Sequence, residues 1–127
     1  MKFIRNNSKI IVCDIGASPC DPTEHLEELL NNTESFLYGF EPNEEEFNKL
    51  KITKKKNFFQ KAIGDGSNHI LNLCAYPGWT SFLEPDIEYI KKFHNFEEAS
   101  EIINKISIKT EKLDNINFEQ KIDFFKI

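Results

Sequence analysis

Two apolar runs decide the fold of this chain: residues 10–16, I-I-V-C-D-I-G, and residues 36–41, F-L-Y-G-F-E. The first run contains Asp14 and ends at Gly16, and the second ends on Glu41, 25 residues after that glycine. Buried parallel strands have this composition. In an open α/β sheet, a glycine after one strand admits a nucleotide ligand, and an acid ending the next strand binds two ribose hydroxyls. The spacing therefore predicts a site for an adenosine-containing cofactor.

The first half of the sequence predicts alternating strands and helices. Strands are expected at residues 10–15, 35–40 and 58–63, with helices that begin after Asp21 and Asn43. Both residues are favoured N-caps, and each has a glutamate three positions later, as in a capping box. A β-α-β-α-β order predicts a parallel sheet with right-handed crossovers.

The pattern changes in the second half. Residues 70–74 and 105–110 alternate between apolar and polar side chains and predict an antiparallel pair, with a short helix at residues 85–94 between them. Residues 122–127 predict another strand, in which the chain ends. The expected fold is one α/β domain over residues 1–127: a Rossmann-like open sheet, mostly parallel, truncated after its fourth core strand, with an inserted β-hairpin-like segment.

Composition narrows the class of protein. The 127 residues are 39% hydrophobic and 29% charged, which is typical of one soluble domain. A net charge of −5 argues against nucleic-acid and anionic-membrane partners. The three cysteines form no C-x-x-C pair, and no apolar run is long enough to span a bilayer, so we expect a cytoplasmic protein without a metal site. The lysines at 54–56 predict a solvated loop.

Five segments, in order, resemble the N-terminal part of the FkbM-type methyltransferases, which use S-adenosylmethionine (SAM). They are V-C-D-I-G-A-S (12–18), Y-G-F-E-P-N (38–43), K-A-I-G-D (61–65), K-L-D-N-I (112–116) and I-D-F-F-K-I (122–127). The family pattern continues as K-I-D-x-E-G, and this chain ends one residue before that acid. The resemblance implies a class I methyltransferase domain that is incomplete at its C-terminus, either a fragment or a natural truncation.

The resemblance also implies where the cofactor lies. The methionine half of SAM would occupy the turn after the first strand, its carboxylate near backbone N–H groups and the positive end of the following helix. The acid after the second strand would bind the ribose, and the end of the third strand would flank the adenine. The predicted cofactor-binding residues are Asp14, Gly16, Ala17, Ser18, Glu41, Ala62, Ile63 and Asp65.

The expected activity is transfer of a methyl group to a hydroxyl of a sugar or other small molecule. The loop at 76–82, Y-P-G-W-T-S-F, would either stack on that acceptor or plug the sheet edge. A truncated, non-catalytic Rossmann-like binding module is the alternative, in which a partner or a second copy covers the exposed edge. An NAD-binding oxidoreductase fragment is disfavoured, because Ser18 and Asp21 stand where G-x-G-x-x-G requires glycines.

Overall fold

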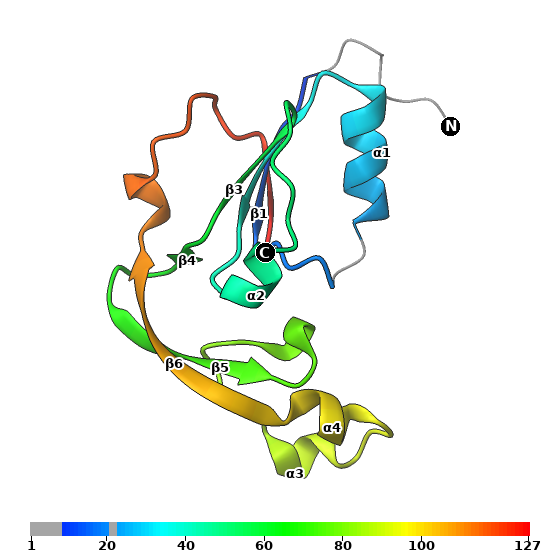
Figure 1. The fold of residues 1–127 in the computed structure, drawn as a ribbon, viewed down its shortest axis with the longest axis vertical. Helices are drawn as coiled ribbons and strands as arrows, with labels where there is room; N and C mark the ends of the chain where they lie inside the picture. Colours follow the sequence, from blue (N-terminus) through cyan, green and yellow to red (C-terminus); the bar gives the residue numbers. More distant parts are fainter. Residues whose placement is uncertain (1–8, 21–22) are drawn as a thin grey trace.

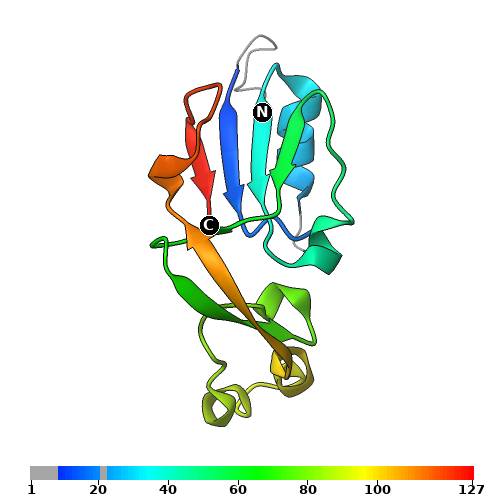
Figure 2. The ribbon, with the colours of Figure 1, turned by 60° about the vertical axis from the view of Figure 1, so that its left-hand side comes forward.

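A parallel four-stranded sheet forms one half of the molecule in the computed structural model, which describes residues 9–20 and 23–127 (Figure 2). The strand order is β3-β2-β1-β7, and every neighbouring pair is parallel. The strands are β1 (Ile11–Ile15), β2 (Phe36–Phe40), β3 (Lys56–Phe59) and β7 (Phe124–Lys126). The α/β class and the mostly parallel sheet are therefore as predicted, and the arrangement is compatible with a Rossmann-like fold.

Helix α1 (Glu24–Asn32) covers one face of this sheet (Figure 1). The core between them consists of Val12, Ala17, Leu30, Leu37 and Phe58. The helix begins at Glu24, with Thr23 at the N-cap position and no side-chain capping bond, whereas the predicted cap at Asp21 lies outside the described residues. Helix α2 (Glu44–Phe47) has the predicted cap, because the Asn43 side chain accepts a hydrogen bond from the N–H of Glu45.

Aromatic side chains fill the opposite face of the sheet. Successive residues of a strand point to opposite faces, so Phe58 faces α1 whereas Phe36, Tyr38 and Phe59 face the other way. Phe118, from the segment that precedes β7, packs edge-on against Tyr38 with ring centroids 5.1 Å apart. Much of this packing around Tyr38 thus comes from four phenylalanines, Phe36, Phe40, Phe59 and Phe118.

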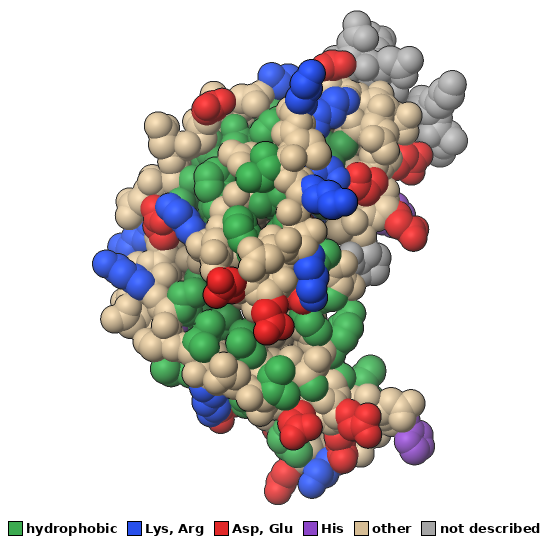
Figure 3. All heavy atoms as spheres, viewed as in Figure 1, with side chains coloured by type: hydrophobic (Ala, Val, Ile, Leu, Met, Phe, Trp, Pro, Cys, Tyr) green, Lys and Arg blue, Asp and Glu red, His purple; other side chains and the backbone are tan. Residues whose placement is uncertain are grey.

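A second, three-stranded sheet lies beyond the carboxyl ends of the parallel strands. Its order is β4-β6-β5, with β4 parallel to β6 and β5 antiparallel to β6, so the expected antiparallel pair is confirmed. The remaining helices flank this sheet. Figure 3 shows acidic side chains gathered over two of them, α3 (Ile87–Ile90) and α4 (Phe96–Ser100). The elements are β4 (Ala62–Ile63), β5 (Asn68–Cys74), η1 (Pro77–Trp79), α3 (Ile87–Ile90), α4 (Phe96–Ser100), β6 (Ile102–Glu111) and η2 (Leu113–Asn115).

Two expected elements are wrong in extent. The strand predicted at 58–63 is two strands in different sheets, because the chain breaks at Gln60 and Lys61, and β4 then pairs with β6. The helix predicted at 85–94 is only the four-residue α3, capped by Asp86. Apolar periodicity alone did not show either break.

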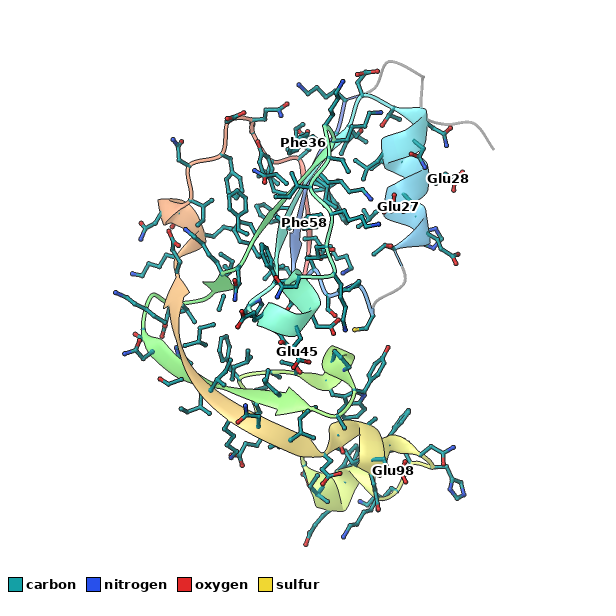
Figure 4. All side chains as sticks on the ribbon, in the orientation of Figure 1. Glu27, Glu28, Phe36, Glu45, Phe58 and Glu98 are labelled. Atoms are coloured by element: carbon teal, nitrogen blue, oxygen red, sulfur yellow. The ribbon has the colours of Figure 1, made fainter. Side chains whose placement is uncertain are left out.

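The lysine run is also different from the prediction of a solvated loop. Lys55 Nζ donates to the carbonyl oxygens of Leu30 and Thr33, both at 2.6 Å, where α1 ends. Lys56 pairs with Glu27 of the same helix, labelled in Figure 4. Only Lys54 of the three is exposed. Two lysines therefore hold α1 against the edge of the sheet.

Candidate functional site

A cavity of about 460 Å³ lies at the carboxyl ends of the parallel strands, between the two sheets. The turn after β1 supplies Gly16 and Ser18, the end of β2 supplies Glu41, and the start of the second sheet supplies Ala62 and Ile63. Strands β2 and β3 lie on one side of β1 and β7 on the other. Open α/β sheets bind ligands at such a reversal of strand order, and the volume is typical of small-molecule sites.

Gly16 lines the cavity without a side chain that would occupy it. Its φ of +82° is a conformation that residues with a side chain rarely adopt, and an added Cβ would have no atom within 4 Å. The N–H groups of Gly16 and Ala17 both donate to the carbonyl oxygen of Phe40, at 2.9 Å each. These two donors are therefore satisfied within the protein, so a ligand carboxylate at this turn would need other partners.

Glu41 is positioned by the backbone on both sides of it. Its N–H donates to the carbonyl oxygen of Phe59 at 3.1 Å, which continues the β2–β3 ladder by one residue. Its carboxylate Oε1 accepts a hydrogen bond of 2.8 Å from the N–H of Asn43. The residue is only 4% exposed although it lines the cavity. An ionised carboxylate accepts up to about four hydrogen bonds, so this group is suited to the hydroxyl pair of a ribose.

Ser18 is held by an acid that the sequence did not indicate as a site residue. Its Oγ lies 2.7 Å from Oε2 of Glu46, which is 3% exposed and also pairs with Lys49. Burial raises the pKa of Glu46, but the hydrogen bonds from Lys49 and Ser18 lower it more, so the net pKa is below its ordinary value. The sequence signal was the spacing Asn43-x-x-Glu46, which predicts a capping box, but Glu46 turns to Ser18 instead.

Three predicted residues do not line this cavity. Asp14 is 2% exposed and pairs with Lys126 of β7, Oδ1 to Nζ at 2.9 Å. Ala17 is packed in the core against α1. Asp65 lies in a separate polar hollow beside Thr110. The structure thus brings together Gly16, Ser18, Glu41, Ala62 and Ile63 and leaves the other three outside the cavity wall.

Asp65 is paired with His69 outside the cavity. Its Oδ1 lies 2.9 Å from Nε2 of His69 and accepts a 2.8 Å hydrogen bond from the N–H of Ser67. The bond from His69, then that from Ser67, lowers the pKa of Asp65 from 3.8 to about 2. This exposed carboxylate stabilises the turn before β5.

Part of the predicted aromatic loop lines the cavity. Pro77, Gly78, Thr80, Ser81 and Phe82 line it. The loop is tied to β5, because Ser81 and Asn72 exchange backbone hydrogen bonds and Thr80 Oγ1 accepts from the N–H of Cys74. The Trp79 ring packs instead against Phe96 of α4, with centroids 5.6 Å apart.

No family model, curated protein or solved structure matches the chain. Its functional assignment therefore depends on the motifs and on the geometry of the cavity. Over the residues that the structure describes, no helix has the length and apolar content to cross a bilayer. Within the same residues, no group of three histidine, cysteine or acidic side chains is arranged to hold a metal ion.

Proposed function

We propose that this chain is a SAM-binding domain of the class I methyltransferase type, related to the FkbM-type enzymes, and that it serves methylation of a hydroxyl on a sugar or small molecule. The observation that carries the proposal is the meeting of Gly16 and Glu41 in one cavity at the strand-order reversal. A glycine after one strand and an acid after the next are the residue types with which open α/β sheets bind a nucleoside.

The described residues fit the adenosine part of SAM. Glu41 offers a buried carboxylate for the ribose hydroxyls, and Ala62 and Ile63 offer a small apolar wall for the adenine. The open space over Gly16 is where a side chain would block the ligand. A pyrophosphate requires more glycines in this turn than the chain has, so SAM fits better than NAD.

The chemistry requires little acid–base catalysis from the protein. SAM carries a methyl group on a sulfonium, which is already a good leaving group, so the residues mainly orient the acceptor and exclude water. The segment at residues 77–82 is suited to this task because five of its residues line the same cavity as Glu41. Lys61 also lines the cavity, and its ammonium is 2.6 Å from Oε2 of Glu111.

Calorimetric titration with S-adenosylhomocysteine tests the proposal. We expect saturable binding, and we expect Glu41→Ala to weaken it by about 1–3 kcal/mol, because the ribose hydroxyls lose their charged acceptor. Glu28→Ala is the matched control, since this exposed glutamate lies on α1 (Figure 4). Equal affinity of Glu41→Ala and native chain, or tighter binding of NAD, would contradict the proposal.

A non-catalytic binding module is the second candidate, favoured by the outer strand β7. Its Phe124 and Phe125 are 55% and 42% exposed, which is unusual for large aromatic side chains at a sheet edge. A methyl-transfer assay with radiolabelled SAM and a panel of sugar acceptors separates the two. Binding without turnover on any acceptor favours the second candidate.

A further inference from the structure

The corner of the cavity formed by Ser18 has a defined hydrogen-bond polarity. A hydroxyl has a single proton to donate and accepts with its lone pairs. The Ser18 Oγ lies 2.7 Å from Oε2 of Glu46 and 3.0 Å from the Sγ of Cys20. Because the carboxylate is ionised and closer, it takes the proton. Ser18 therefore presents only acceptor capacity toward the cavity.

The backbone at this corner adds no donor from Gly16 or Ala17. Their N–H groups are bonded to Phe40, as described above. Helix α1 begins only at Glu24, and its first turn carries Glu24 and Glu27, which oppose an anion there. The N–H of Cys20 donates to the same Ser18 oxygen at 3.4 Å, so this group is also bonded within the protein. The N–H groups of Gly16, Ala17 and Cys20 are thus not available to a ligand carboxylate. The ionised Glu46 beside Ser18 also repels such a carboxylate.

We infer that Glu46, acting through Ser18, directs the ammonium of the ligand's amino-acid end to this corner of the cavity and keeps the ligand carboxylate away from it. This inference rests on the proposed function, since it concerns the methionine half of SAM. An ammonium is a donor without acceptor capacity, so it matches a serine that can only accept. Glu46 is a positioning residue here, because it does not line the cavity itself.

The Glu46→Gln variant tests this inference, because Lys49 fixes the orientation of the side chain at position 46. The lysine can only donate, so it will bind the amide oxygen introduced by Glu46→Gln and leave the amide NH₂ facing Ser18. Ser18 must then accept from that amide, which uses acceptor capacity of its oxygen and leaves its proton to Cys20 Sγ, at 3.0 Å, or to the cavity. The substitution should therefore weaken the acceptor character of the corner and remove its negative charge while keeping its shape.

Calorimetry with three probes measures this polarity. The probes are S-adenosylhomocysteine, its analogue without the α-amino group, and its analogue without the carboxylate. With the native chain, removal of the amino group should weaken binding about tenfold, and removal of the carboxylate should weaken it less. With Glu46→Gln, S-adenosylhomocysteine should bind about tenfold more weakly and the amino-free analogue should bind as before. Glu45→Gln, an exposed neighbour on α2, is the matched control.

The outcomes separate the inference from the proposed function. Failure of all three probes to bind the folded native chain overturns both. If all three probes bind and Glu46→Gln weakens each of them equally, the inference alone is overturned, because a purely structural acid affects every ligand alike. The inference alone is also overturned if removal of the amino group does not weaken binding to the native chain. Should Glu46→Gln fail to fold by circular dichroism, Ser18→Ala provides the test, because it removes the acceptor and should abolish the preference for the amino group.

Discussion

Lys126 Nζ lies 2.9 Å from Asp14 Oδ1, a contact that joins β7 to β1 across 112 positions of sequence. Asp14 is 2% exposed and sits in the middle of the parallel sheet, where β1 and β7 pair residue by residue. A buried carboxylate is costly unless charged or polar groups surround it. This ion pair therefore couples the last strand to the first.

Replacement of that lysine should destabilise the fold. We expect Lys126→Met to lower the free energy of unfolding by about 1–3 kcal/mol, because a buried charge loses a charged partner. Urea denaturation followed by fluorescence measures the change. Adding Asp14→Asn should restore part of the loss, since the neutral amide is cheaper to bury; a double variant no more stable than Lys126→Met would argue that the pair does not couple the strands.

The lysine run offers a matched comparison for the end of α1. Lys55→Met should cost about 1–2 kcal/mol of unfolding free energy, because two carbonyl oxygens at the helix C-terminus lose a charged donor. Lys54→Met, at the exposed neighbour, should change the stability by less than about 0.5 kcal/mol. Thermal and urea denaturation of the two variants test this difference. Equal effects would mean that the contact of Lys55 with α1 contributes nothing.

Gly39 is required by close packing and not by its backbone conformation. A Cβ at this position would lie 2.4 Å from Cδ1 of Phe58 and 3.0 Å from Cβ of Ala17. Gly39→Ala should therefore destabilise the chain by about 1–3 kcal/mol through overpacking. Combining it with Phe58→Leu should cost less than the sum of the two single changes. Simple additivity in denaturation experiments would show that the ring is not the obstacle.

The pKa of Asp65 gives a pH-dependent prediction. His69→Ala should raise the Asp65 pKa from about 2 toward 3.8, because the largest lowering contribution comes from the His69 hydrogen bond. Carbon-13 NMR titration of the carboxyl measures it, with His94→Ala as control. A carboxyl whose pKa is lower in the folded than in the unfolded chain stabilises the fold at pH values above its unfolded-state pKa. This stabilisation is lost as the pH falls from about 3.8 to about 2. An unchanged Asp65 pKa in His69→Ala would contradict the assignment.

Local sequence patterns predicted the elements that form the candidate site. The apolar runs of β1 and β2, the glycine at 16 and the acid at 41 can be recognised one segment at a time, because strand burial and turn chemistry depend on neighbouring residues. Parallel pairing then places the carboxyl ends of the strands at one edge, and Gly16 and Glu41 meet there. The antiparallel pair in the second half followed from alternation in the same way.

Tertiary structure decided which polar groups share a buried environment. Ser18 and Glu46 are 28 positions apart and Asp14 and Lys126 are 112 apart, so no local pattern marks either contact. The break at residues 60–61 is likewise set by pairing of β4 with β6, which carries Asp65 out of the cavity wall. Buried charges take the partners that the packed chain brings within reach, and that choice depends on the whole fold.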